Sequence, residues 1–457
     1  MASESIHHSS SYKDPSGFIF EKEGILYRQV NISFKEHFDH FIQSGCYKYF
    51  IDKDVLIPHE EVDENLTGDL NYYKTLKPEK IPFISYPYEW SFDMLKDAAL
   101  LTLKLLKESL QFGMILKDAT PYNIQWHNGK LIFIDTLSFE KYEETPWIAY
   151  RQFCENFLGP LLIMHYSGQP LNQLLLAWPD GIPLQIIRSL LPKRSGFSLH
   201  VYLHIHLHNK VSVKNQSASD KQLKFSKEKL LRLITSLELL INKLKLPFQN
   251  STWSGYYEEA SRRNEYLDEK KKIIDKWLNE STNIKTAADL GANEGEFSKL
   301  LAAKNIKTIA TDFDPYCINT LYNKIKTTKE KNIQPAIIDL SNPSPAIGVN
   351  NEERASFIDR LNVDVVLILA VIHHLAIGKN IPFEKVAEML VGITNYLVIE
   401  FVPKDDEKVK LMLENKKDIY ADYSEESFLK AFSTYFSVRE KIFFQNSQRV
   451  FFLMERK

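Results

Sequence analysis

The stretch from Thr286 to Leu300 constrains the fold more strongly than any other part of the chain. It reads TAADLGANEGEFSKL, in which a short apolar run ends at Asp289 and leads through Gly291 and Gly295 into a helical pattern. Glycine permits the tight turn between a strand and a helix, and it lets a ligand approach the amide groups at the helix N-terminus. The pattern predicts an α/β domain with a nucleotide-type loop, and an ordinary strand-to-helix turn is the alternative.

Three further apolar runs end in residues that could contact a ligand. These runs and the residues after them are 306–310 with Asp312 and Phe313, 335–338 with Asp339 and Leu340, and 363–370 with His373 and His374. Asp312 follows the glycine loop by about twenty residues, which is where an acidic group grips a ribose diol. Because the carboxyl ends of parallel strands meet at one edge of a sheet, all four strand ends are expected to form one site.

In this order, the segments DLGANEG, TDFD, IDL and LILAVIHHL resemble class I S-adenosylmethionine-dependent methyltransferases over residues 284–457. The resemblance implies a seven-stranded Rossmann-like sheet with helices on both faces, completed by strands at 395–401, 438–444 and 449–455. It implies S-adenosylmethionine as the cofactor, bound by Asp289, Gly291, Ala292, Asn293, Gly295, Asp312, Phe313, Asp339, Leu340 and Ala370. A nicotinamide-binding domain is the alternative, but its Gly-x-Gly-x-x-Gly pattern fails at Asn293.

The candidate catalytic residues are His373 and His374, and the candidate acceptor-binding residues are Arg354 and Glu400. A base is needed when the methyl acceptor is a hydroxyl or an acidic carbon, and imidazole titrates near neutral pH. Adjacent residues point in different directions, so one histidine is expected to be structural, and the sequence leaves open which. Arg354 lies in an insertion after the third strand and could clamp a carboxylate or phosphate, with an exposed helix charge as the alternative. Glu400 ends the fifth strand.

The N-terminal half contains a second constellation, KDATPYNIQWHNGKLIFIDTLSF. The order and spacing of Asp118, Asn123 and Asp135 resemble protein kinases and aminoglycoside phosphotransferases, where such residues contact the substrate hydroxyl and the metal ion. The resemblance implies a kinase-like fold, with Arg28 placed like the phosphate-anchoring lysine. The chain departs from that family because Leu137 replaces the glycine after the second aspartate and no glycine-rich loop precedes Arg28. The alternative is a buried loop whose polar side chains cap turns.

The pattern along the chain predicts two domains joined by a helix. Residues 1–12 are expected to be a disordered tail, 13–250 an α+β domain, 251–280 a linker helix and 281–457 the methyltransferase domain. Within the α+β domain, strands are expected at 17–20, 24–30 and 81–86, helices at 34–45 and 91–112, and an irregular segment up to Lys80. Lys270–Lys272 are expected on the solvated face of the linker helix.

Four histidines lie close together between Ser198 and Asn209, namely His200, His204, His206 and His208. Imidazoles at this spacing can hold a transition metal, but no carboxylate or cysteine accompanies them. A packed face is therefore the preferred interpretation, and no metal site is predicted in the chain.

Bulk properties limit the partners and the compartment. The formal net charge of −2 gives no electrostatic reason to expect a nucleic-acid partner. No apolar run is long enough to span a bilayer and the N-terminus lacks a signal-peptide pattern, so no membrane association is expected. Three widely separated cysteines suggest neither a disulfide framework nor a zinc ribbon, which favours the cytoplasm. The oligomeric state is not predicted.

Taken over nearly its whole length, the chain is similar to a bacterial group related to nodulation host-specificity methyltransferases of the NoeA kind, through KDATPYNIQ, EERAS, IHHL and EFVPKDD. The predicted function is methyl transfer from S-adenosylmethionine to an oxygen or carbon nucleophile of a small-molecule or saccharide acceptor, with the N-terminal domain assisting recognition. Two alternatives stay open. One is a regulatory protein with a pseudokinase-like domain fused to a methyltransferase domain, and the other is a bifunctional phosphotransferase-methyltransferase.

Overall fold

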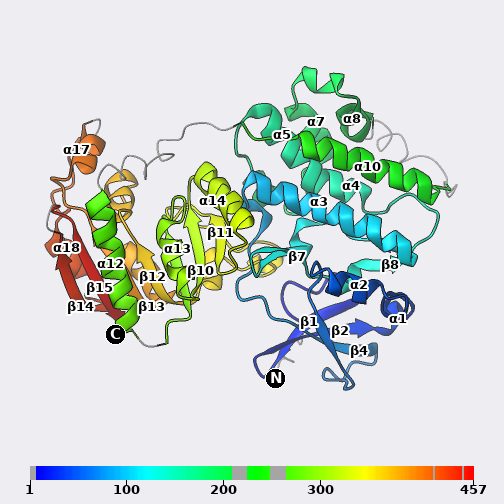
Figure 1. Ribbon diagram of the computed structural model, residues 1–457, viewed down its shortest axis with the longest axis horizontal. Coiled ribbons are helices and arrows are strands. Elements are labelled where there is room, and N and C mark those ends of the chain that lie inside the picture. The colour runs from blue at the N-terminus through cyan, green and yellow to red at the C-terminus, as the bar shows by residue number, and fades with distance from the viewer. Residues whose placement is uncertain (1–6, 208–223, 248–263, 282, 415–416, 445–446) are drawn as a thin grey trace. The chain divides into compact units, whose positions relative to one another are not determined.

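The computed structural model of the chain describes residues 7–207, 224–247, 264–281, 283–414, 417–444 and 447–457 (Figure 1). The chain divides into two compact units. The first unit is Met1–Pro247 with Ala346–Arg354, and the second is Phe248–Pro345 with Ala355–Lys457. The short segment Ala346–Arg354 therefore groups with the first unit, although its neighbours in the sequence belong to the second. Parts of the predicted tail and of the predicted linker helix lie outside the described residues.

The second unit is built on a seven-stranded sheet, as predicted, with strand order β11-β10-β9-β12-β13-β15-β14. Its strands are β9 (Thr286–Leu290), β10 (Lys307–Asp312), β11 (Ile333–Ile337), β12 (Val363–Ile368), β13 (Thr394–Phe401), β14 (Phe436–Phe443) and β15 (Val450–Arg456). The first five of these run parallel, and β15 is antiparallel to both of its neighbours. The glycine loop therefore leaves a central strand, and the carboxyl ends of β9, β10, β11 and β12 share one edge.

Helices cover both faces of this sheet, as predicted. They are α12 (Asn264–Glu280), α13 (Glu296–Ala303), α14 (Pro315–Thr328), α15 (Phe357–Arg360), α16 (Phe383–Val391), α17 (Glu407–Leu413) and α18 (Glu425–Phe432). One core joins Trp277 of α12 and Leu301 of α13 to Leu367 of β12. On the opposite face, Phe428 of α18 contacts the ring of Phe452 at a centroid distance of 5.4 Å. Strands buried on both faces read as nearly continuous apolar runs, which explains why the sequence revealed them.

The first unit opens with a four-stranded antiparallel sheet of order β1-β2-β4-β3 and continues into a mainly helical part (Figure 1). The strands of this unit are β1 (Gly17–Lys22), β2 (Ile25–Asn31), β3 (His59–Val62), β4 (Tyr72–Pro78), β5 (Met114–Leu116), β6 (Ile124–His127), β7 (Lys130–Phe133) and β8 (Phe139–Lys141). The helices are α1 (Lys35–Gln43), α2 (Cys46–Asp52), α3 (Phe92–Ser109), α4 (Tyr150–Phe153), α5 (Gly159–Ser167), α6 (Leu174–Ala177), α7 (Leu184–Leu190), α8 (Leu199–Val201) and α10 (Lys227–Lys243). Ser91 caps the N-terminus of α3, because its hydroxyl accepts a hydrogen bond from the amide of Met94.

Two local predictions for the first unit were wrong. Residues 81–86 form no strand, because the main chain of Ser85 bonds the side-chain amide of Gln125 through both its N–H and its C=O. The segment expected to be irregular instead contains β3 and β4. The sequence of β3, HEEV, places exposed Glu60 and Glu61 in a pairing with β4, and such a charged edge strand lacks the apolar alternation used to predict strands.

The histidine-rich segment is helical and packs within the first unit. It forms α8 and a π-helix, Tyr202–Leu207. The two ring nitrogens of buried His204 lie 2.7 Å from the hydroxyl of Tyr150 and 2.9 Å from that of Ser236. Within the described ranges no group of three or more His, Cys, Asp or Glu residues could hold a metal ion, and His208 lies outside those ranges. His204 therefore takes part in the packing of the first unit.

A search for membrane-crossing helices over the described residues finds none with the necessary length and apolar character.

Candidate functional site

The loop after β9 is held in shape by its own hydrogen bonds. Gly291, Asn293 and Gly295 have φ angles of 87°, 52° and 79°. The amides of Gly291 and Ala292 both donate to the carbonyl of Thr311 at 2.8 Å. These two amides are consequently not available to donate to a ligand. Their hydrogen bonds to β10 fix the shape of the loop instead.

Neighbouring side chains also pack closely on the two glycines of this loop. A Cβ on Gly291 would lie 2.3 Å from Cγ2 of Val371, and one on Gly295 would lie 2.6 Å from Cδ1 of Leu321. Contacts below 3.0 Å are not tolerated without movement of a neighbour. The turn after β12 therefore lies directly against the glycine loop, which brings the first and fourth predicted ligand-binding segments of this edge together.

Two buried aspartates lie at the ends of β9 and β10. Asp312 accepts hydrogen bonds from the amides of Asn293 at 2.8 Å and Asp314 at 2.9 Å, one on each carboxylate oxygen. Asp289 accepts a hydrogen bond from the hydroxyl of Ser298 at 2.6 Å. Burial raises the pKa of each carboxyl group to about 6. Each oxygen of Asp312 retains a lone pair, so this carboxylate can still accept hydrogen bonds from a diol.

The hydroxyl of Thr311, next to Asp312, is buried and has no hydrogen-bond partner among the described residues. A buried polar atom without a partner costs free energy unless a ligand or water satisfies it. The neighbouring Phe313 is 55% exposed, so its ring is accessible. The end of β10 thus carries a buried hydroxyl without a partner in the described ranges, on Thr311, and an exposed aromatic ring, on Phe313.

After the next strand, β11, Asp339 accepts hydrogen bonds from the amide and hydroxyl of Ser341, and Leu340 is half-buried.

The two histidines after β12 occupy different environments. His373 is 2% exposed, and its Nδ1 atom has no hydrogen-bond partner in the described part of the chain. His374 is half-buried, begins a π-helical turn at His374–Gly378, and its ring lies 4.1 Å from that of His373. Burial lowers the pKa of His373 well below its usual value and lowers that of His374 to about 4. Both rings are therefore neutral at physiological pH. Ala370, before them, has a φ of 55°.

Glu400 is fully buried and already has several partners. Lys270 of α12 lies 2.6 Å from one of its oxygens and Arg449 lies 3.3 Å from the other, which also accepts the hydroxyl hydrogen of Tyr266. Arg449 makes a second, bidentate pair with Asp406 at 2.8 and 3.1 Å. Burial pulls the pKa of Glu400 upward, but Lys270 and Arg449 outweigh it and lower the pKa. Glu400 therefore holds two buried cations in place.

Sequence reasoning missed Lys270, Arg449 and Tyr266. Lys270 was expected on a solvated face but is 5% exposed. A usable signal was present, because Tyr266, Lys270, Ile274 and Trp277 recur at helical spacing along the face of α12 that packs on the sheet. Arg449 carried no comparable local signal, since its partners Glu400 and Asp406 lie 49 and 43 residues away in the sequence.

Arg354 belongs to the first unit, whereas the strand-end residues belong to the second. Its guanidinium carbon is 4.4 Å from the ring centroid of Tyr122, and one guanidinium nitrogen donates to the carbonyl of Glu353. Glu353 in turn pairs with Lys13 at 2.8 Å. These contacts give Arg354 a cation–π partner on the loop that carries Asp118 and Asn123.

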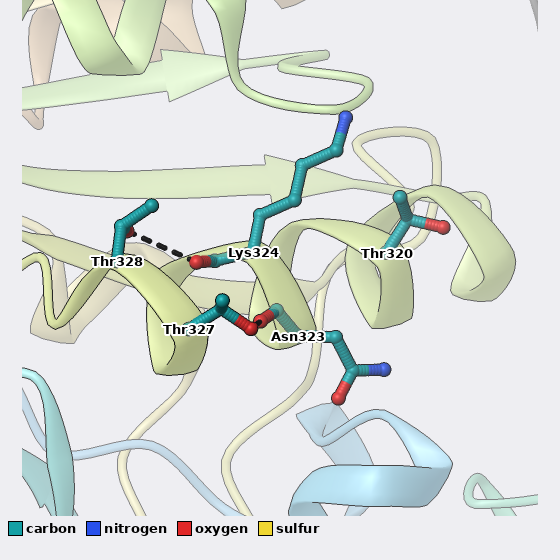
Figure 2. Close-up of a pocket in the computed structure, with 5 residues that line it drawn as sticks. All are labelled: Thr320, Asn323, Lys324, Thr327 and Thr328. Carbon is teal, nitrogen blue, oxygen red and sulfur yellow. Dashed lines mark hydrogen bonds between the residues drawn. The ribbon is translucent and has the colours of Figure 1, made fainter.

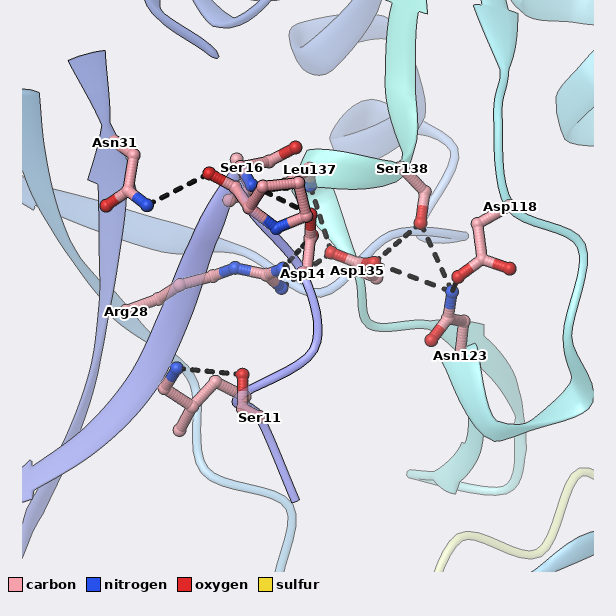
Figure 3. Close-up of polar contacts among 12 residues, drawn as sticks. Ser11, Asp14, Ser16, Arg28, Asn31, Asp118, Asn123, Asp135, Leu137 and Ser138 are labelled. Carbon is pink, nitrogen blue, oxygen red and sulfur yellow. Dashed lines mark hydrogen bonds and ion pairs between the residues drawn. The ribbon is translucent and has the colours of Figure 1, made fainter. Parts of the chain in front are cut away.

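The predicted residues of the first unit come together around that loop (Figure 3). The side-chain amide of Asn123 donates to Asp118 at 3.0 Å and to Asp135 at 3.5 Å. Arg28, on β2, lies 2.6 Å from the other oxygen of Asp135. Ser138 donates to Asp135 at 2.6 Å, so each oxygen of this carboxylate has a partner within the chain. Burial and the charge of Asp135 raise the pKa of Asp118.

A shallow depression of about 420 Å³ lies along α14 (Figure 2). It is lined by Thr320, Asn323, Lys324, Thr327 and Thr328. The hydroxyls of Thr327 and Thr328 donate to carbonyls one turn earlier in the same helix. None of the predicted site residues lines this depression, so the candidate site is defined by the strand ends instead.

Comparison with known proteins gives one extensive match in sequence. The nodulation protein NoeA of Rhizobium meliloti (strain 1021) is 32% identical over 467 residues, covering 98% of this chain and 96% of the relative. The predicted whole-chain similarity is thereby confirmed. No protein-family model matches the chain.

Similar solved structures are more remote. Magnesium protoporphyrin IX methyltransferase (ChlM) from Synechocystis PCC 6803 is 15% identical with a TM-score of 0.31, covering 41% of this chain and 82% of that one. N-methyltransferase NodS from Bradyrhizobium japonicum WM9 is 12% identical with a TM-score of 0.32, covering 42% and 97%. WbdD, crystallised with a kinase inhibitor, is 14% identical with a TM-score of 0.30, covering 48% and 47%. TM-scores of this size carry no conclusion about the present chain.

Proposed function

We propose that this chain, which belongs to the family of the nodulation protein NoeA, is an S-adenosylmethionine-dependent methyltransferase. Its acceptor is an oxygen or carbon nucleophile of a small molecule or saccharide, and the first unit assists in recognising that acceptor. The observation that carries the proposal is the edge of the seven-stranded sheet. There Asp312 is held at the end of β10 by the amides of Asn293 and Asp314, beside the glycine loop.

The residues at this edge fit S-adenosylmethionine. Asp312 suits the ribose hydroxyls, because a carboxylate can accept hydrogen bonds from both. Asp339 and Leu340 suit the adenine amino group and ring, and the loop from Gly291 to Asn293 suits the methionine end. The buried hydroxyl of Thr311 has no hydrogen-bond partner among the described residues and is a further polar group near this edge. When bound, the cofactor would supply a methyl group that is already activated for transfer by the positive charge on its sulfur.

The protein's own part in such a reaction is alignment and proton removal. Methyl transfer requires the acceptor atom to be held in line with the methyl carbon and sulfur, and holding reactants in place is worth several kcal/mol, roughly 7–11 in the best cases. A hydroxyl acceptor must also lose its proton. The histidines after β12 are the only two in the sequence of the second unit, and they follow the turn that packs on Gly291.

Isothermal calorimetry with S-adenosylmethionine and S-adenosylhomocysteine tests this proposal. Both ligands are expected to bind, and Asp312→Ala is expected to weaken binding roughly tenfold to a hundredfold through loss of charge-assisted hydrogen bonds. Asp405→Ala, on the surface, is the matched control and should bind like the unaltered protein. Absence of binding at millimolar ligand, or equal binding by Asp312→Ala, would contradict the proposal.

A second candidate function is phosphoryl transfer by the first unit, which would make the protein bifunctional. The convergence of Asp118, Asn123 and Asp135 favours it. Against it, Asp135 is already paired with Arg28 and hydrogen-bonded to Ser138, which leaves little of its carboxylate for a metal ion. We therefore propose that the first unit is a kinase-like domain that has lost catalysis. Its role is then recognition or regulation.

Magnesium-dependent ATP hydrolysis separates these two functions of the first unit. The non-catalytic interpretation predicts no hydrolysis above that of an Asp135→Asn variant. Hydrolysis by the unaltered chain that Asp135→Asn abolishes would show a working phosphotransferase instead.

A further inference from the structure

The Nδ1 atom of His373 is the one unsatisfied ring nitrogen of the two histidines after β12 among the described residues. The side chain is 2% exposed, so bulk water does not satisfy this nitrogen. Buried polar atoms are nearly always hydrogen-bonded, and an exception calls for a ligand, a water or a functional role. His374, in contrast, is half-buried and is the first residue of the π-helical turn.

Backbone geometry places the segment that carries His373 next to the glycine loop. Val371, two residues before His373, packs so closely on Gly291 that no Cβ fits between them. Ala370 adopts a left-handed φ of 55°, which turns the chain sharply at the end of β12. The sharp turn and the close contact fix the segment that carries His373 against the loop assigned to the cofactor.

A group of buried charged side chains acts electrostatically on His373. Lys270 from α12 and Arg449, which directly precedes β15, act electrostatically on its ring, as does His374 beside it. Glu400 of β13 pairs with both cations, and Arg449 also pairs with Asp406, which precedes α17. This group of side chains, together with Tyr266 on Glu400, is here called the Glu400 cluster. Its two cations favour a neutral imidazole, and burial lowers the pKa of His373 in the same direction.

We propose that Nδ1 of His373, and not the ring of His374, is the atom that accepts the proton of the methyl acceptor, which requires the His373 ring to be its Nε2–H tautomer before the transfer. This inference rests on the proposed methyltransferase function and deepens it. In the step, the acceptor O–H or C–H bond breaks, its electron pair stays on oxygen or carbon as the nucleophile, and the proton passes to the lone pair on Nδ1. The acceptor class is accordingly a hydroxyl or an acidic carbon, which must lose a proton in order to react.

The tautomer of His373 can be measured without knowing the acceptor. The full-length chain is labelled with ¹⁵N-histidine, and the signals of His373 are identified by their loss in His373→Gln. We expect Nδ1 unprotonated and Nε2 protonated between pH 6 and 8, both free and with saturating S-adenosylhomocysteine. An Nδ1–H tautomer, or a doubly protonated ring at pH 7, would overturn the proposal. Calorimetry on the same sample keeps the two proposals separate, because failure of S-adenosylhomocysteine to bind removes the proposed function, whereas binding with the wrong tautomer removes only this inference.

A pair of neighbouring variants tests whether the Glu400 cluster acts on His373. If His373→Gln does not fold, the ¹⁵N signals that shift in only one of these variants identify His373 instead. Lys270→Met removes a buried cation, so the pKa of His373 should rise. Lys271→Met removes the next lysine of the same helix, which pairs with Glu296 at a partly exposed site, and should leave that pKa unchanged. The readout is the pH titration of the ¹⁵N signals. No difference between the two variants would show that the cluster does not act on His373.

Discussion

At the scale of single residues, the buried carboxylates of the second unit determine how it should respond to pH. Burial raises the pKa of Asp312 to about 6. Ribose hydroxyls donate hydrogen bonds to the charged form, so bound cofactor should lower this pKa, and protonation of the free protein should compete with binding. Affinity for S-adenosylhomocysteine is therefore expected to be constant above about pH 7 and to fall by up to roughly tenfold per unit as pH drops below 6.

Calorimetric titrations from pH 5 to 8 check this dependence. Repeating them in buffers of different ionisation enthalpy counts the protons released on binding. The carboxyl of Asp289 titrates in the same range, so Asp289→Asn serves to separate the two contributions. An affinity that does not change between pH 7 and pH 5 would show that Asp312 does not hold the ribose.

Glu400 is the second residue whose burial leads to a prediction. Its removal leaves Lys270 and Arg449 without their shared carboxylate, and breaking a buried ion pair costs about 3–5 kcal/mol. Glu400→Gln should lower the free energy of unfolding of the second unit by about that amount. Glu440→Gln is the control, because Glu440 also pairs with a lysine of α12, Lys276, but at a more exposed site, and glutamine can still accept the hydrogen bond from the indole of Trp277. Surface pairs are worth about 0–1 kcal/mol.

Urea denaturation of the two glutamate variants provides the measurement. Equal losses of stability at the two positions would mean that Arg449 and Asp406 compensate for the missing carboxylate.

At the scale of elements, the glycine loop depends on the turn after β12. Gly291 has a φ of 87°, and a Cβ at this position would meet Val371. Gly291→Ala should therefore destabilise the second unit through both effects, by about 1–2 kcal/mol from the left-handed conformation alone and more from the clash. Adding Val371→Ala removes the clash and should recover part of the loss.

Gly24→Ala separates the two costs, because Gly24 has a φ of 77° but nothing within 4 Å of the added Cβ. The free energies of unfolding and the affinity for S-adenosylhomocysteine are the quantities to compare. If the double variant is no more stable than Gly291→Ala, packing against Val371 is not what the glycine accommodates.

At the scale of the whole molecule, the chain consists of two units with separate cores. Val30, Phe38 and Leu137 belong to a core cluster of the first unit, and Trp277, Leu301 and Leu367 belong to one of the second. Scanning calorimetry should therefore show two transitions. S-adenosylhomocysteine at a hundred times its dissociation constant should stabilise only the second unit, by about 2.7 kcal/mol. A single transition that shifts as a whole would indicate that the two units unfold together.

Much of the second unit could be predicted from the sequence, because its signals are local. A strand buried on both faces is a continuous apolar run, and the residues that follow it must lie at the sheet edge. The run of β9, the glycines after it and the acidic end of β10 therefore predicted an α/β sheet and which strand ends meet, whereas the number of seven strands came from the resemblance to class I methyltransferases. In the first unit, the spacing of Asp118, Asn123 and Asp135 likewise anticipated that their side chains come together.

Tertiary structure alone decided which charged residues are buried and what they contact. Lys270 and Glu400 pair across 130 residues of sequence, and neither residue's neighbours in the chain indicate its partner. The placement of Arg354 over Tyr122 and the orphaned Nδ1 of His373 depend equally on segments brought together only by folding. The physical reason is that backbone conformation follows largely from local pattern, whereas the burial and pairing of a charge depend on every element packed around it.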